Sequence, residues 1–186
     1  MMIRTVDCKP RLSGLSYFPE LDNGDCLYFC LWQILKGLSF PVPQIHKDVA
    51  SATMRTFLFK FIEERWTIAS SISGVFWSDM ITMSHNTAVT DDELSTYGSW
   101  GITAEAQLAA WKAERDTMYG SPVEVTAFVE WLKEWGIPIA VRVWRRSNNS
   151  LVMSSCIGDA VTESEARIVV DLHHTGRLDT NDAHYK

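Results

Sequence analysis

The chain has 186 residues, a length that a single globular domain with a sizeable core accommodates. Hydrophobic residues make up 46% and charged residues 22% of it, which excludes the disordered and fibrous classes. The net charge of −6 argues against a general nucleic-acid binder, because phosphate contacts need a basic face and the basic stretch Arg142 to Arg146 is short. We therefore expect residues 1–186 to form one domain that binds no nucleic acid, and a basic protein is the easier partner to accommodate.

The sequence also bears on compartment and cofactors. No window holds the roughly 18 uncharged apolar residues that span a bilayer, and the N-terminal "MMIRTVDCKP" lacks an apolar signal core. The four cysteines, Cys8, Cys26, Cys30 and Cys156, fit no paired CxxC zinc pattern. We expect a cytosolic protein whose thiols stay reduced and which needs no metal or other cofactor.

Taken in chain order, the first half of the sequence is expected to be mainly helical. Residues 1–20 carry prolines and a glycine and predict an extended lead-in. Residues 26–36 predict a helix that starts at or just before Cys26 and stops at Gly37. Residues 44–66 have apolar side chains near helical spacing and predict one or two helices, whereas residues 67–90 fit either an inserted loop or a small helix.

The second half begins with helices and ends with strands. Residues 91–117 predict helix, and a second helix has clear start signals: Ser121 as N-cap, Pro122 at the first position and Glu124 completing a capping box. Gly136 is expected to end this helix. Three segments rich in β-branched residues then predict strands: "IPIAVRVW" (137–144), "LVMSSCIG" (151–158) and "ARIVVDLHH" (166–174). Helices followed by a run of strands predict an α+β fold with a small sheet packed on helices.

Cys26 is the residue on which the chemistry depends. An isolated cysteine in a cytosolic protein is most often a buried core residue, and a disulfide with Cys30 is disfavoured because the two lie four apart on one helix. Gly24, flanked by Asn23 and Asp25, can form a sharp turn and present backbone N–H groups to an oxyanion. A helix that opens at Cys26 is expected to favour its thiolate, so we interpret Cys26 as a nucleophile and assign Cys30 to the core.

A thiolate nucleophile needs a base, and the sequence offers five histidines for that role. His46, in a predicted helix, and His85, in the unassigned segment, are most simply surface residues. His173 and His174 end a predicted strand, where solvated polar residues are common. His184 follows a turn-rich stretch, and a returning strand would bring it back to the edge of the sheet.

Three blocks of sequence, in order, resemble the ovarian tumour (OTU) family of cysteine proteases, which remove ubiquitin. "NGDCLY" (23–28) matches the family's nucleophile motif, D-G-[ND]-C-[LF]-[FY]. "YGSPVEV" (119–125) followed by "WGIPIAVRVW" (135–144) is similar to its second block. "ARIVVDLHHTG" (166–176) through His184 and Tyr185 is similar to its third. The branch that looks most alike is the viral OTU domain of the large (L) polymerase protein, an RNA-directed RNA polymerase, of nairovirus-like viruses.

The resemblance implies a fold and a function. It implies a papain-like OTU fold with a small central sheet between helices, forming a monomeric domain excised from a larger viral protein. It implies a thiol protease in the host cytoplasm that removes ubiquitin or ubiquitin-like modifiers from host proteins and so counters innate immunity.

The resemblance also assigns roles to residues. Cys26 is the nucleophile, His184 the general base, and the loop of Asn23, Gly24 and Asp25 supplies oxyanion donors. Tyr119 and Ser121 are expected to lie along the channel for the ubiquitin tail, with plain core packing an equal alternative for Tyr119.

Two positions depart from the family pattern. Asn23 replaces the usual Asp three residues before the nucleophile, and Lys186 stands where an acid or amide usually orients the histidine. We favour Asp182 as the orienting residue, and a Cys–His dyad is the alternative. Other candidates are Asp22, Asp179 and Asn181.

Three other functions remain open from the sequence. The departures at Asn23 and Lys186 also fit an OTU-like module that binds ubiquitin without cleaving it. The same cysteine and histidine would serve a papain-like protease that cuts a viral polyprotein. A purely structural domain is the weakest alternative, because three ordered motifs would then be coincidence.

Overall fold

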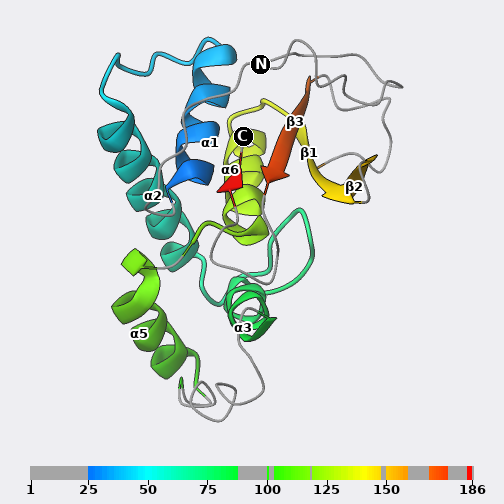
Figure 1. The fold of residues 1–186 in the computed structure, drawn as a ribbon. Coiled ribbons are helices and arrows are strands. Elements are labelled where there is room, and N and C mark those ends of the chain that lie inside the picture. Colours follow the sequence, from blue (N-terminus) through cyan, green and yellow to red (C-terminus); the bar gives the residue numbers. More distant parts are fainter. Residues whose placement is uncertain are drawn as a thin grey trace.

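The computed structural model describes residues 25–87, 100, 103–117, 119–147, 150–158, 168–175 and 184–185. In this part of the chain (Figure 1) the α-helices are α1 (Cys26–Gly37), α2 (Lys47–Glu64), α3 (Trp77–Thr87), α5 (Ala104–Glu114) and α6 (Pro122–Glu134). A 3-10 helix, η2 (Arg115–Thr117), follows α5. The strands are β1 (Ile139–Ser147), β2 (Ser150–Gly158), β3 (Ile168–Thr175) and β4 (His184–Tyr185).

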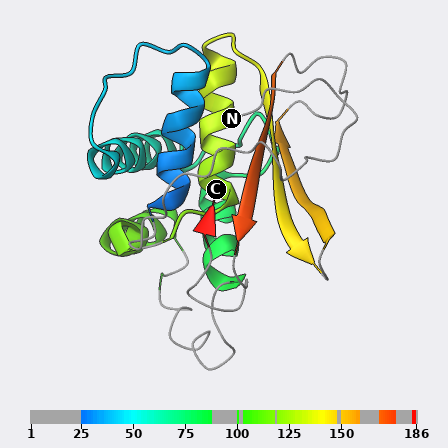
Figure 2. The ribbon, with the colours of Figure 1, turned by 45° about the horizontal axis from the view of Figure 1, so that its top comes forward.

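The strands form one four-stranded sheet in the order β2-β1-β3-β4. β1 pairs antiparallel with β2 and parallel with β3, and β3 pairs antiparallel with β4. α6 contacts β1 and β2, α1 contacts β4, and these helices lie on the same side of the sheet (Figure 2). The α+β fold class is therefore shown. The family resemblance implies a sheet with helices on both faces. Among the described residues, helices cover only one face of the sheet.

The core fills the space between the sheet and helices α1, α2 and α6. Its helical side chains recur at three- and four-residue spacing, which places them on one face of each helix. Fully buried examples are Leu27 and Leu31 of α1, Leu58 and Ile62 of α2, and Phe128 and Leu132 of α6. Full burial of such a side chain contributes roughly 1.5–3 kcal/mol to the stability of the fold. These buried side chains therefore hold the helices against the sheet.

Tryptophans extend this core toward α5. Six of the eight are buried, and only Trp135, at 65%, is well exposed. Trp66 stacks on Trp111 with ring centroids 5.2 Å apart, and the indole N–H of Trp66 donates to the carbonyl of Ala104 at 2.9 Å. The high tryptophan content therefore serves mainly core packing.

Both ends of α6 agree with the sequence prediction. Ser121 is its N-cap, and the Ser121–Glu124 capping box is complete. At the other end Gly136 adopts φ +73°, and the N–H groups of Gly136 and Ile137 donate to the carbonyls of Lys133 and Leu132, a Schellman motif.

The other helices depart in detail from what the sequence predicts. α1 includes Gly37, and the left-handed residue beyond its end is Ser39, with φ +60°. Residues 44–66 hold one helix, α2, and His46 is its exposed N-cap residue rather than a helical one. Most of the unassigned segment folds as a turn followed by α3.

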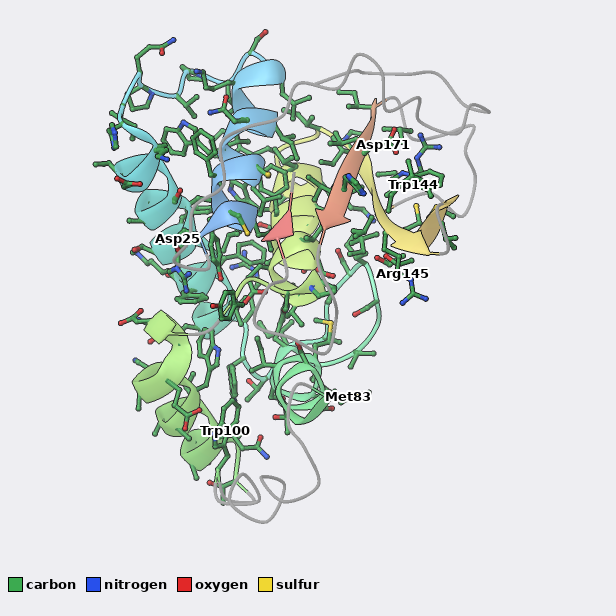
Figure 3. All side chains as sticks on the ribbon, viewed as in Figure 1. Asp25, Met83, Trp100, Trp144, Arg145 and Asp171 are labelled. Carbon is green, nitrogen blue, oxygen red and sulfur yellow. The ribbon has the colours of Figure 1, made fainter. Side chains whose placement is uncertain are left out.

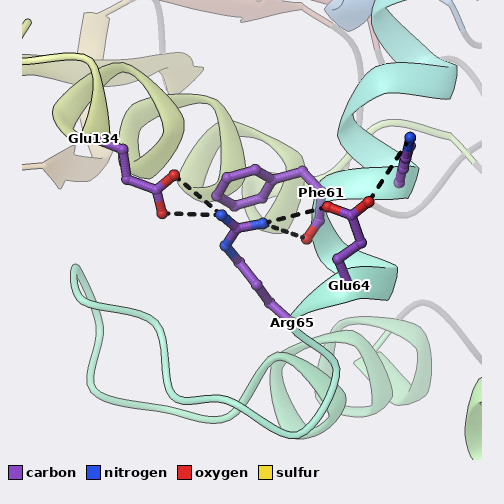
Figure 4. A network of polar contacts seen from close by, with 5 residues as sticks. Phe61, Glu64, Arg65 and Glu134 are labelled. Atoms are coloured by element: carbon purple, nitrogen blue, oxygen red, sulfur yellow. Dashed lines mark hydrogen bonds and ion pairs between the residues drawn. The ribbon is translucent and has the colours of Figure 1, made fainter.

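Long-range polar contacts fix these helices to one another. Arg65, at the end of α2, donates to both carboxylate oxygens of Glu134 on α6 at 3.2 and 3.0 Å (Figure 4). Its guanidinium carbon lies 3.7 Å from the centroid of the Phe61 ring. The turn before α3 is fixed by buried Glu130 of α6, which accepts hydrogen bonds from the Ser70 hydroxyl at 2.5 Å and the Ser71 N–H at 2.9 Å. Within the described residues, no helix has the length and apolar character needed to cross a bilayer.

Candidate active site

Cys26 is the first residue of α1. The carbonyl of the preceding residue, Asp25, accepts the first helical hydrogen bond from the Phe29 N–H at 3.0 Å. Cys26 is 6% exposed, so its thiol lies just below the surface at the positive end of the helix dipole. The structure therefore agrees with the predicted helix start at Cys26.

Cys30 lies one turn further along α1 and belongs to the core. It is 5% exposed, and burial, with a smaller contribution from the charge of Cys26, raises the pKa of the Cys30 thiol to about 12. Both residues are present as thiols and form no disulfide. The core assignment of Cys30 is confirmed.

The strand that carries His184 lies beside α1, the helix that begins at Cys26. His184 is the first residue of β4, which pairs with the end of β3 so that Thr175 opposes His184 and His174 opposes Tyr185. β4 and α1 approach within 8 Å between Cα atoms, and both ribbon views place the red β4 next to the dark-blue first turn of α1 (Figures 1 and 2). Two segments about 160 residues apart in the chain thus meet at the start of α1. His174, in the strand paired with β4, is the alternative base.

His173 lies on the other face of the sheet. Alternation along β3 puts buried Val170 and Leu172 toward the core and Asp171 and His173 on the opposite face. Both ring nitrogens of His173 are buried, which contradicts the expectation of a solvated strand end. Its position on this face excludes it as the partner of Cys26.

Asp171 organises that opposite face. Its carboxylate accepts from Arg142 at 2.7 and 3.0 Å and from the indole N–H of Trp144 at 2.7 Å. Figure 3 shows Asp171 and Trp144 on the sheet, away from Asp25 at the start of α1. This cluster therefore lies outside the candidate active site.

The second sequence block reaches α1 through Gly120. A Cβ on Gly120 would lie 2.6 Å from Cδ2 and 2.8 Å from Cβ of Leu27, the residue after Cys26. Only glycine permits this close approach. Tyr119, next to it, is 46% exposed, so it lies at the surface near the first turn of α1. This exposure argues against plain core packing for Tyr119, and its contact with a ubiquitin tail stays a prediction.

Ser121 is engaged in capping α6. Its hydroxyl accepts from the Val123 N–H at 3.1 Å and donates to Glu124 at 2.6 Å, and its own N–H donates to the same carboxylate at 2.7 Å. The described role of Ser121 is thus structural. Burial raises the pKa of Glu124, although the hydrogen bonds from Ser121 act in the opposite direction.

Asp25 makes a contact that the sequence did not suggest. Its side chain forms no hydrogen bond to the first turn of α1; instead Oδ1 accepts from Arg55 Nε at 2.7 Å and lies 2.5 Å from Arg55 Nη2. Arg55 lies on α2, and the two side chains are only 11% and 14% exposed. The sequence holds only a weak indication of this contact. Arg55 lies four residues from both Ser51 and Phe59, which places it on a buried face of α2.

The remaining expected site residues cannot be placed. Asn23, Gly24 and Asp182 lie outside the described residues, as do the other candidates for orienting the histidine. The side chains of His184 and His174 are likewise not described, so the Cys26–His184 pairing rests on their backbone positions. In the part of the chain that the structure describes, no group of three or more His, Cys, Asp or Glu side chains is placed to hold a metal ion.

Comparison of the chain with protein-family models, with characterised proteins and with solved structures finds no match.

Proposed function

We propose that the protein is a cysteine-type deubiquitinase with an OTU-like, papain-like fold. It hydrolyses the isopeptide bond between the C-terminal glycine of ubiquitin, or of a ubiquitin-like modifier, and a lysine of a host protein. The proposal places this domain in a nairovirus-like L protein acting in the host cytoplasm.

The observation that carries the proposal is the meeting of β4 with the first turn of α1. A cysteine opens that helix and a histidine opens that strand. A Cys nucleophile needs a base in its vicinity, and the base need not be close in sequence. The Tyr119–Gly120 segment, which contacts Leu27, adds a further surface beside the same helix end.

In the proposed mechanism His184 takes the proton of the Cys26 thiol. The sulfur then attacks the carbonyl carbon of the terminal glycine, and backbone N–H groups of Cys26 and the 23–25 loop stabilise the oxyanion. The C–N bond breaks, and the lysine amine leaves with the proton from His184. Water, deprotonated by His184, hydrolyses the thioester and releases the ubiquitin carboxylate.

Cleavage of isopeptide-linked diubiquitin by purified variants tests the proposal. Wild type should cleave it, Cys26→Ala should be inactive, and His184→Ala should lose at least about 10²-fold in rate, the contribution typical of a general base. Two matched controls should stay active: Cys156→Ser, which removes an exposed thiol on the opposite edge strand, and His174→Ala. Loss of activity in His174→Ala with retention in His184→Ala would reassign the base, and an inactive wild type would refute hydrolysis.

A non-hydrolytic ubiquitin-binding module is the second candidate. The burial of Cys26, at 6% exposure, favours it, because an attacking sulfur must reach the substrate carbonyl. Binding of ubiquitin by wild type and Cys26→Ala alike, without cleavage, would support this candidate. Cleavage of the flanking viral sequence in place of diubiquitin would indicate a polyprotein protease.

A further inference from the structure

The carboxylate of Asp25 is paired with Arg55 of α2 and does not cap the helix that it precedes. An aspartate at an N-cap normally accepts hydrogen bonds from the second or third N–H of the helix. Asp25 occupies this position in α1, and its main-chain carbonyl accepts the Phe29 N–H, but its side chain makes no capping bond. The negative charge next to Cys26 is therefore paired with a cation of α2.

Arg55 holds the carboxylate in this orientation. Two of its nitrogens approach the same oxygen of Asp25, at 2.7 and 2.5 Å. The guanidinium is itself fixed, since its carbon lies 4.4 Å from the Tyr28 ring centroid and 5.7 Å from that of Phe59. Its Nη1 also donates to the Arg115 carbonyl at 3.3 Å. A part-buried, charge-assisted contact of this kind is stronger than a hydrogen bond between neutral groups.

We propose that Arg55 is a positioning residue of the hydrolase site, which acts through Asp25. It fixes the side chain of the residue before Cys26 and offsets the negative charge of the Asp25 carboxylate beside the Cys26 sulfur. This inference rests on the proposed function for its catalytic meaning. Without Arg55 the charge of the Asp25 carboxylate, one residue from Cys26, would no longer be offset and would oppose both the thiolate and the oxyanion.

The pH dependence of Cys26 alkylation tests the inference without any substrate. Iodoacetamide labelling of Cys26 would be followed by mass spectrometry from pH 5 to 10 in a Cys156→Ser background. Arg55→Met releases the carboxylate, so the apparent pKa of labelling should rise by about one unit, equivalent to about tenfold slower labelling at neutral pH. The double variant Arg55→Met/Asp25→Asn has no carboxylate to release, and its labelling profile should return close to that of the parent.

These labelling results show whether Arg55 acts on Cys26 through Asp25 or only stabilises the fold. If Arg55 only stabilised the fold, both variants would label alike, and an unchanged profile in Arg55→Met would also overturn the inference. If Arg55→Met does not fold, as judged by its melting curve, Arg55→Lys replaces it, because lysine lacks the two-atom fork and should still show an upward shift. No shift in Arg55→Lys would then overturn the inference.

Diubiquitin cleavage by the same proteins distinguishes the two proposals. With hydrolysis established, kcat of Arg55→Met should fall about 10- to 100-fold while KM changes little, since Asp25 and Arg55 act on the reacting groups and not on ubiquitin docking. If Arg55→Met shows the alkylation shift but the wild type cleaves no diubiquitin, the proposed function is refuted and the effect of Arg55 and Asp25 on Cys26 is retained.

Discussion

Cys26 and Cys30 lie one helical turn apart in α1, and their surroundings give the two thiols different chemistry. Cys30 is enclosed by the core, where a thiolate has no water to solvate it, so burial raises its pKa to about 12. Cys26 lies at the end of the helix, where the dipole favours negative charge.

The first prediction concerns the reactivity of Cys30. At pH 8 a thiol of pKa about 12 is ionised in only about one molecule in ten thousand. Iodoacetamide at that pH should therefore leave Cys30 unlabelled in the folded protein while exposed Cys156 reacts to completion. Peptide mass spectrometry measures both sites, and unfolding in urea should remove the difference. Labelling of Cys30 at the rate of Cys156 in the folded protein would contradict its assignment to the core.

The second prediction concerns the contact of Gly120 with Leu27. The added methyl of Gly120→Ala meets the Cβ of a fully buried residue, which cannot move without the helix, so overpacking should cost about 1–3 kcal/mol. The contact is next to the nucleophile, so diubiquitin cleavage should also fall.

Gly136→Ala is the matched control for Gly120→Ala. It has no atom within 4 Å of the new Cβ, but its φ of +73° costs about 1–2 kcal/mol. It lies at the opposite end of α6, so stability should fall and cleavage should not. Urea unfolding and rate assays separate the two effects. Equal loss of activity in both variants would show that the Gly120 contact has no special part in the site.

At the scale of elements, a few charged side chains link the helices to one another. Lys112 of α5 and Arg115 of η2 donate to Glu63 of α2 at 2.5 and 3.0 Å. These hydrogen bonds lower the pKa of Glu63, and the bond from Lys112 has the larger effect. Arg65 ties the end of α2 to α6 through Glu134 (Figure 4).

The third prediction measures the Arg65 contact. Arg65→Ala removes both the ring contact with Phe61 and the two-oxygen contact with Glu134, and should cost about 1–2 kcal/mol in the free energy of unfolding. Glu134→Gln keeps the ring contact and should cost less than half as much. Urea denaturation in 0.1 M salt gives both values, and an equal cost would show that the aromatic contact contributes nothing.

The elements that could be predicted from sequence are those whose signals are local. The N-cap, proline and capping box of α6 lie within four residues of one another, and the structure agrees with each of them. α2 lacks such signals, since its N-cap His46 makes no side-chain capping bond, and the sequence could not decide between one helix and two. The turn before α3 depends on Glu130, which lies about 60 residues away in the chain, and no local pattern reports that contact.

The same distinction applies to the candidate site. The helix start at Cys26 can be predicted from its own neighbours. The pairing of His184 with Cys26 is implied only by the family resemblance, and the structure brings β4 next to α1. The Asp25–Arg55 pair could not be predicted because the local sequence marks Asp25 only as a turn residue beside Gly24, and its partner lies 30 residues further along the chain.

At the scale of the whole molecule, the fold gathers three distant segments around the first turn of α1. The turn itself carries Cys26, the Tyr119–Gly120 segment packs on Leu27, and β4 brings the backbone of His184 alongside. α2 contacts this site through Arg55, which forms an ion pair with Asp25. The negative net charge of −6 is compatible with a basic protein as substrate.

The most direct measurement of the central claim is covalent capture by ubiquitin that carries an electrophile at its C-terminus. If a base activates the Cys26 thiolate and bound ubiquitin brings its electrophile to it, the protein should form one covalent adduct. Mass spectrometry should locate this adduct on Cys26. The adduct should be absent in Cys26→Ala, slowed in His184→Ala and unchanged in Cys156→Ser. No adduct at high protein concentration, or an adduct that persists in Cys26→Ala, would contradict the account.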